Sequence, residues 1–264
     1  MRLRLLLLAL LALALPATAA GSLPLPFGIV DANAPRSTPL RALGAQLFAG
    51  NCAICHGPGG KGFVDEPTQN VSGSIVGKGP SLRGVGEMAP DFYLRTGRMP
   101  LGTLDEQPSR NPVLLNERQI RALIAYVGSL APGPAIPHPH PERGSVSKGL
   151  TLFTERCAGC HQVVAEGGYL TGAEAPALKD ATPTQVAEAV RIGPYVMPRF
   201  SKTALTDSEL DSIVAYVQYA KTPNDSGGWS LGHVGPIPEG LVAWLIAAAA
   251  LVAVCLVLGR RLKR

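Results

Sequence analysis

The chain has 264 residues and a formal net charge of +5, and this length allows two small domains. Six of its cations flank two apolar segments near the chain ends: Arg2, Arg4, Arg260, Arg261, Lys263 and Arg264. Without these six the net charge is −1 (5 − 6), so we predict no nucleic-acid partner and attribute the basic balance to membrane topology.

Residues 1–20 have the pattern of a secretory signal peptide. A short basic start precedes a leucine-rich stretch, and small residues follow it at Ala17–Ala20. The alternative is an uncleaved anchor, although the apolar stretch is shorter than the ~20 residues that a membrane span needs. No cysteine lies near residue 20, which argues against a lipoprotein. Residues 21–35 carry several prolines and are expected to form an extended lead-in.

A helix is expected from Thr38, and it leads into the segment Cys52–His56. Two cysteines three positions apart, with a histidine directly after the second, are the attachment pattern of a c-type haem. Cys52 and Cys55 would form thioethers to the haem, and the imidazole of His56 would bind the iron. A disulfide within the motif is the alternative for an exported chain, but such bridges belong to βαβ units, which the sequence does not show.

The first domain, residues 36–131, is expected to close with a helix, because Asn116–Gln119 resembles a capping box before an apolar stripe. A linker follows at residues 132–144, and its five prolines favour a semi-rigid polyproline II segment. The linker residues His138 and His140 are expected to be exposed to solvent; metal ligation is the alternative.

Residues 145–222 are predicted to repeat the first domain and to close with a helix that starts at the capping box Thr206–Glu209. The repeat predicts a second covalent haem c and an all-α fold of two tandem c-type haem domains. Its aromatic residues are expected to pack between helices. Five residues recur at the same offset: Gly44, Phe48, Cys52, Cys55 and His56 correspond to Gly149, Phe153, Cys157, Cys160 and His161.

Residues 240–259 carry no charge and are predicted to form one transmembrane helix after a juxtamembrane loop at residues 223–239. Trp244 lies near the start of this helix, and residues 260–264 form a basic tail that obeys the positive-inside rule. We therefore expect a single-pass protein of the plasma membrane, with extracytoplasmic haem domains and a cytoplasmic C-terminus. Cys255 is interpreted as a small apolar residue of this helix.

The sixth iron ligand decides what a histidine-bound haem does. Met99 and Met197 each stand in a Met-Pro pair between the haem motif and the closing helix of their copy, and both are predicted to bind iron. Met88 has no counterpart in the second copy and is expected to pack. Two filled axial positions leave no place for a substrate, so these sites would transfer electrons, and we predict no catalytic residue.

Pro80 and Pro176 occupy matching positions between each histidine and its methionine. A metal-bound imidazole commonly donates its second N–H to a carbonyl, and a proline carbonyl is such an acceptor. The alternative is an ordinary turn. Arg98 and Arg199 flank the methionines, either as partners of haem propionates or as solvated side chains.

Taken together, the chain resembles the dihaem cytochrome c subunit of the actinobacterial menaquinol:cytochrome c reductase, the cytochrome bcc complex. The resemblance implies cytochrome c-type helical domains in an electron-transfer subunit of a translocase. It also implies three partners, namely a cytochrome b subunit, a Rieske iron–sulfur protein that reduces the first haem, and a haem–copper oxidase that the second haem reduces. It rests on the two haem motifs and on Gly79–Leu82, Gly97–Pro100, Met197–Pro198 and Gly232–Gly240.

The resemblance also assigns the two sites to different sides of the electron path. The donor-side site would comprise Cys52, Cys55, His56 and Met99, and the acceptor-side site Cys157, Cys160, His161 and Met197. Two other functions stay open. One is a different anchored dihaem cytochrome, such as an oxidase subunit or the acceptor of a membrane dehydrogenase. The other is a dihaem peroxidase, which needs one haem open to peroxide.

Overall fold

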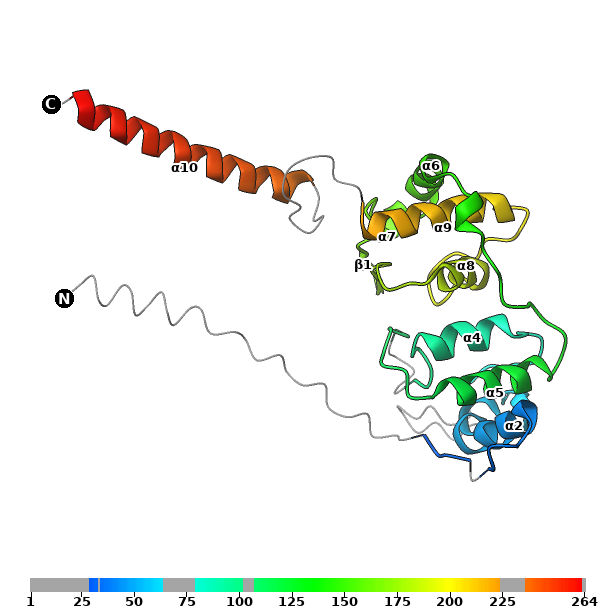
Figure 1. The fold of residues 1–264 in the computed structure, drawn as a ribbon. Helices are drawn as coiled ribbons and strands as arrows, with labels where there is room; N and C mark the ends of the chain where they lie inside the picture. Colours follow the sequence, from blue (N-terminus) through cyan, green and yellow to red (C-terminus); the bar gives the residue numbers. More distant parts are fainter. Residues whose placement is uncertain (1–28, 33, 64–78, 102–106, 224–235, 263–264) are drawn as a thin grey trace, which may run out of the picture.

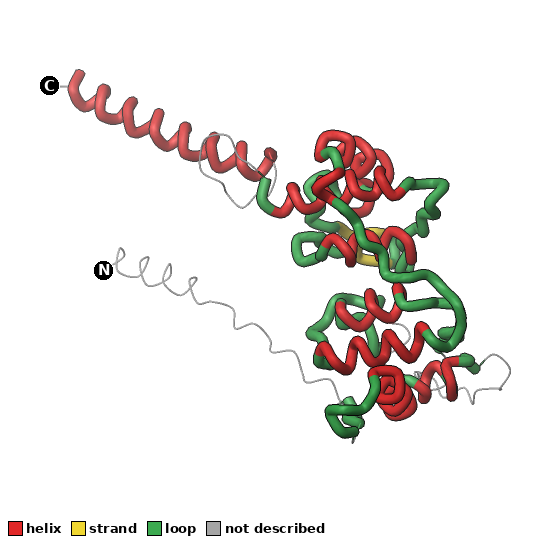
Figure 2. The backbone as a smooth tube through the Cα atoms, turned by 45° about the vertical axis from the view of Figure 1, so that its right-hand side comes forward, coloured by secondary structure: helices red, strands yellow, loops and turns green. Residues whose placement is uncertain are grey.

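The computed structural model describes residues 29–32, 34–63, 79–101, 107–223 and 236–262. Two helical domains follow one another along the chain, and a long C-terminal helix comes after them (Figure 1). The all-α prediction is confirmed. One small antiparallel hairpin in the second domain was not expected, with strands β1 (Gly168–Leu170) and β2 (Ala173–Ala175) (Figure 2).

The first domain is held together by the crossing of helices α2 (Leu40–Asn51) and α5 (Glu117–Gly128). Gly44 permits the close approach, because a Cβ there would lie 2.0 Å from the carbonyl oxygen of Ala122. Beside it, the rings of Phe48 and Tyr126 pack with centroids 5.2 Å apart. The predicted capping box of α5 is present, so this helix begins where the sequence indicates. The remaining elements are α3 (Ala53–His56), a 3-10 turn at Pro58–Gly60 and α4 (Met88–Arg95).

The second domain repeats this crossing with helices α6 (Val146–Arg156) and α9 (Asp207–Lys221). A Cβ on Gly149 would lie 2.0 Å from the carbonyl oxygen of Ser212, and Phe153 packs against Tyr216 with centroids 5.3 Å apart. The predicted repeat and the packing role of its aromatic residues are confirmed. Helix α7 (Ala158–His161) corresponds to α3, and α8 (Pro183–Ile192) and α9 both start at capping boxes.

The proline-rich linker lies against both domains. Residues 132–140 form no helix or strand, and a 3-10 turn follows at Pro141–Arg143. The carbonyl of Pro134 accepts the N–H of Glu87 at 3.0 Å, next to the start of α4, and the N–H of His140 donates to Asp211 Oδ1 at 2.7 Å. The linker histidines are exposed, as expected. The linker therefore fixes a path between the domains.

The two domains also contact each other directly, through α4 of the first and α8 of the second. The side chain of Gln107 donates to the carbonyl of Glu174 at 2.5 Å and accepts the N–H of the same residue at 2.7 Å. Nearby, the guanidinium of Arg110 donates to Gln185 Oε1 at 2.7 Å. The interface thus consists of specific polar contacts as well as helix packing.

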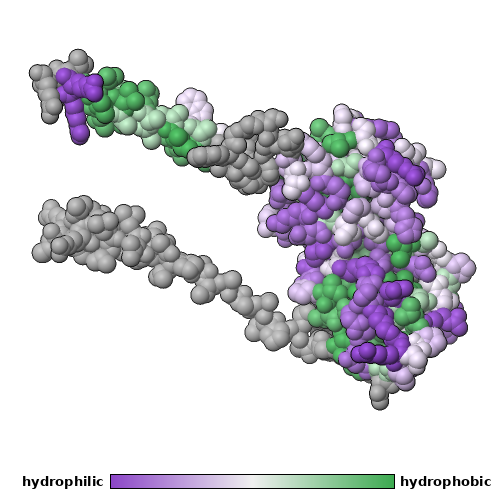
Figure 3. Space-filling view, in the orientation of Figure 1, coloured by the Kyte–Doolittle hydropathy of each residue, from purple (hydrophilic) through white to green (hydrophobic). Residues whose placement is uncertain are grey.

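Helix α10 (Pro236–Leu262) contains an apolar segment, Gly240–Arg261, with a mean hydropathy of 2.9 and no residue buried. It is the only helix of this kind within the described ranges. At 1.5 Å per residue, 22 residues suffice to cross a hydrocarbon core of about 30 Å. Figure 3 shows its apolar surface ending in a hydrophilic tip. The predicted signal peptide at residues 1–20 and residues 232–235 of the Gly232–Gly240 segment lie outside what the structure describes.

Candidate haem sites

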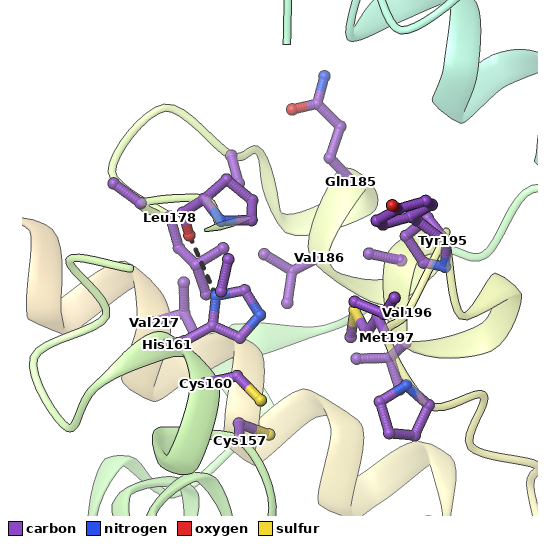
Figure 4. Close-up of a pocket in the computed structure, with 18 of the residues that line it drawn as sticks. Cys157, Cys160, His161, Leu178, Gln185, Val186, Tyr195, Val196, Met197 and Val217 are labelled. Atoms are coloured by element: carbon purple, nitrogen blue, oxygen red, sulfur yellow. Dashed lines mark hydrogen bonds between the residues drawn. The ribbon is translucent and has the colours of Figure 1, made fainter. Parts of the chain in front are cut away.

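The second haem motif is presented by a sharp turn between α6 and α7. Cys157 ends α6, donating its N–H to the carbonyl of Phe153 at 2.8 Å, and its own carbonyl accepts the N–H of His161 at 2.9 Å. This single helical turn places Cys157, Cys160 and His161 on the wall of one apolar cavity of about 200 Å³ (Figure 4). The described cysteines are free thiols, so neither motif forms the alternative disulfide.

His161 is oriented by its neighbour in the loop. Its side chain is buried, and its Nδ1 lies 3.0 Å from the carbonyl oxygen of Pro176. A carbonyl only accepts hydrogen bonds, so Nδ1 carries the proton and the lone pair of Nε2 is left for a metal. Burial lowers the pKa of His161, which favours the neutral imidazole that binds iron. The predicted role of the proline carbonyl is confirmed here.

Met197 lies across the cavity from His161 (Figure 4). Gly193 ends α8 in the left-handed region, at φ 66°, and the N–H of Met197 donates to the carbonyl of Pro194 at 3.0 Å. This turn directs the half-buried thioether toward the cavity, where it packs against the core of the second domain. Two thiols, an imidazole of fixed tautomer and a thioether on one apolar cavity fit a covalent haem c with His and Met ligands.

The first motif has the same local geometry. Nδ1 of His56 lies 2.8 Å from the carbonyl oxygen of Pro80, so the proline carbonyl plays its predicted role here also. The N–H of Gly79 donates to the carbonyl of Cys55 at 2.8 Å, and a Cβ on Gly79 would lie 2.8 Å from Nδ1 of His56. Glycine therefore lets this loop reach the imidazole.

Met99 is half-buried in the loop after α4, and its N–H donates to the carbonyl of Tyr93 at 3.3 Å. Its ligand role stays a prediction. Met88 is buried at the start of α4, which confirms its packing role. Burial raises the pKa of Cys52 to about 12 and that of Cys157 to about 11, so the unattached thiols are protonated at neutral pH.

Part of the second cavity is built from the first domain, which the sequence did not indicate. The side chains come from α4 and from the segments that follow it, and they are Phe92, Arg98, Gln107, Pro108 and Arg110. Of these residues, Arg98 alone was singled out from the sequence, because it flanks the methionine of the first domain. Arg199, by contrast, is exposed.

Comparisons with known proteins agree with this two-site arrangement. Residues 42–131 match the family model described as cytochrome c, and residues 144–217 match the model described as cytochrome c oxidase, cbb3-type, subunit III. Each matched range contains one haem motif and one of the two helix crossings. The chain therefore binds two covalent haem c groups, one in each range.

Curated relatives match nearly the whole chain. The cytochrome bc1 complex cytochrome c subunit of Mycobacterium tuberculosis is 36% identical over 85% of this chain and 79% of its own. The subunit of the same name from Corynebacterium diphtheriae is 33% identical over 83% of this chain and 80% of its own. The cbb3-type cytochrome c oxidase subunit FixP of Rhizobium meliloti is 33% identical over 52% of this chain and 44% of its own.

Proposed function

Because this chain belongs to the family of cytochrome bc1 complex cytochrome c subunits, we propose that it carries electrons from a Rieske iron–sulfur protein to a haem–copper oxidase. The reductase in which it acts would oxidise menaquinol and would also contain a cytochrome b subunit. The observation that carries the proposal is the contact between the two haem domains. Two histidine sites of similar local geometry thus lie in adjoining domains, and this supports a single electron path through both haems.

The chain's own residues favour electron transfer over bond chemistry. Bound haem supplies one-electron oxidation and reduction. His56 and Met99 would occupy both axial positions in the first domain, and His161 and Met197 would do so in the second. The four cysteines would hold the rings in place, and the mainly apolar walls of the second cavity would limit the access of water to the iron. Substrate oxidation would then occur in a partner chain, and this subunit would have no catalytic residue.

The direction of transfer follows the family. The site of Cys52, Cys55 and His56 would accept electrons from the Rieske protein, and the site of Cys157, Cys160 and His161 would pass them to the oxidase. We place the first domain at residues 36–131 and the second at residues 145–222, which the two family-model matches support.

The same proposal fixes the orientation in the membrane. α10 has the length and composition of an anchor, and Arg260 and Arg261 stand in its last turn. By the positive-inside rule this basic end is cytoplasmic, so the haem domains face the extracytoplasmic side of the plasma membrane. Export of the two motifs also agrees with a signal peptide at residues 1–20.

Purification of the full chain from its own membranes tests the partner assignment. We expect cytochrome b and a Rieske protein to co-purify with it. The second candidate function for this chain is that of a subunit of a cbb3-type oxidase. The matched family model and the similarity to FixP favour it. Recovery with oxidase subunits and without cytochrome b would replace the first proposal by the second.

Two haem-deletion variants test the direction of transfer. In the complex, replacing Cys157 and Cys160 by Ala should leave the first haem reducible by quinol and abolish oxygen consumption. Replacing Cys52 and Cys55 by Ala should prevent reduction of the second haem by quinol. The opposite pattern would reverse the order of the two sites.

A further inference from the structure

We propose that Arg98 and Arg110, which belong to the first haem domain, bind the propionates of the haem in the second domain. Both arginines line the second cavity, together with Gln107 from the same segment of the first domain. The second haem would thus be held by both halves of the chain. The inference rests on the haem c of the second domain and is independent of the redox partners.

Arg98 is a half-buried cation that forms no ion pair with any residue of the described ranges. Its Nη1 is buried and has no hydrogen-bond partner among the described residues, and its guanidinium lies 5.0 Å from the ring centroid of Phe92. Arg110 lines the same cavity. A desolvated guanidinium next to a second one is costly unless an anion joins them.

None of the ion pairs among the described residues includes Arg98 or Arg110. Glu174 is the only acidic residue among the described residues that line the cavity. It is exposed, and its backbone rather than its carboxylate is bonded to Gln107. The third cavity arginine, Arg156, donates to the carbonyl of Ala204 at 2.6 Å. Among the described residues that line it, the cavity therefore has more cationic donors than carboxylates to match them.

The expected anion comes with the cofactor. A haem ring carries two propionate carboxylates on one edge, and a ring attached to Cys157 and Cys160 would occupy this cavity, which both cysteines line. Guanidinium groups bind carboxylates through two parallel hydrogen bonds, which suits a planar fork fixed in position. Arg110 is already held toward the cavity by its hydrogen bond to Gln185 of α8.

The contact has a redox consequence across the domain interface. Oxidation adds a positive charge to the haem, so a nearby guanidinium disfavours the ferric state and raises the reduction potential. In this role Arg98 and Arg110 are positioning residues. Arg98 precedes the predicted ligand of the first haem, yet it would adjust the potential of the second.

Potentiometric titration of the full chain, purified with both haems, tests the proposal. Arg98→Gln and Arg110→Gln should each lower the reduced-to-oxidised ratio of the second haem about three- to tenfold at a fixed potential. A tenfold change corresponds to 59 mV for one electron. The released propionate should also make this potential depend on pH. Arg110→Lys should show a smaller shift, because the charge stays and the fork is lost.

Arg199→Gln is the matched control, since Arg199 is exposed beside the methionine of the second domain and should leave both potentials unchanged. The Met99→Ala and Met197→Ala variants assign each step of the titration to one haem. A shift confined to the first haem, or no shift in either arginine variant, would overturn the proposal. If Arg98→Gln does not accumulate with two haems, the Arg110 pair of variants decides by the same criteria.

Discussion

The two haem domains share a framework and differ in how their histidines are enclosed. In both, a glycine lets two helices cross closely, and a proline carbonyl orients the histidine. The loop between histidine and proline is shorter in the second domain, where 15 positions separate His161 from Pro176, against 24 between His56 and Pro80. The imidazole of His161 is also buried, and the first domain covers part of its cavity. The two copies therefore share the features that attach the haem. They differ in the loop after the histidine and in the contact between the domains, which encloses the second site.

Substitutions at the helix crossing that both domains share should cause the largest loss of unfolding free energy. Gly149→Ala places a Cβ 2.0 Å from a backbone carbonyl, and Gly44→Ala does the same in the first domain. Backbone atoms cannot move aside cheaply, so we expect each variant to lose about 3 kcal/mol or more of unfolding free energy in its own domain. Thermal unfolding followed at the haem absorbance measures this loss.

Gly159→Ala provides the control for these variants. No atom lies within 4 Å of a Cβ at Gly159, and Ile54 occupies the equivalent position of the first motif. This variant should unfold like the parent. If Gly149→Ala were as stable as the parent, the close approach of α6 and α9 at Gly149 would be contradicted.

A substitution at the contact between the two domains should change the unfolding free energy by a smaller amount, and this change should depend on pH. Glu188 of α8 is fully buried, and both of its carboxylate oxygens lack a hydrogen-bond partner among the described residues. Burial, reinforced by the nearby carboxylate of Asp91, raises the pKa of Glu188 to about 9. Asp91 in turn pairs with Arg95 at 2.7 Å. The first domain thus contributes an acidic residue and a basic one to the surroundings of Glu188.

Proton linkage gives the direction in which stability changes with pH. Between pH ~4.5 and ~9 the unfolded chain releases the proton of Glu188 while the folded chain keeps it, so this residue lowers stability as the pH rises through that window. Glu188→Gln should flatten the decline and stabilise the protein by about 2 kcal/mol at pH 8. Glu155→Gln, at an exposed position, should change nothing. An unchanged pH profile in Glu188→Gln would contradict the assignment.

The smallest expected effect concerns the residue after each histidine. Gly57 has φ 73° in the first domain, whereas Gln162 has φ 59° with ψ 160°, a region that glycine alone adopts without strain. Gln162→Gly should stabilise the second domain by about 1 kcal/mol, measured as a raised melting temperature. Gln162→Ala keeps the Cβ and should give no gain; a gain from Ala equal to that from Gly would argue against backbone strain.

The sequence predicted features that depend on local spacing. The haem motifs, the capping box at Asn116 and the pairing of His161 with Pro176 all follow from short patterns and from their repetition. The interface contacts of Arg110 and Gln107 were not predicted, because they join segments that are 75 and 67 positions apart in the chain. The hairpin β1–β2 was missed since its three-residue strands are too short to show a period.

Optical redox titration of the full chain tests most directly that it contains two electron-transfer haems with His and Met ligands. We predict two one-electron waves, low-spin ferric spectra and a weak sulfur-to-iron band. Met99→Ala should remove the contribution of one haem to this band, and Met197→Ala that of the other. A high-spin spectrum in the intact protein, or a band insensitive to both substitutions, would contradict the account.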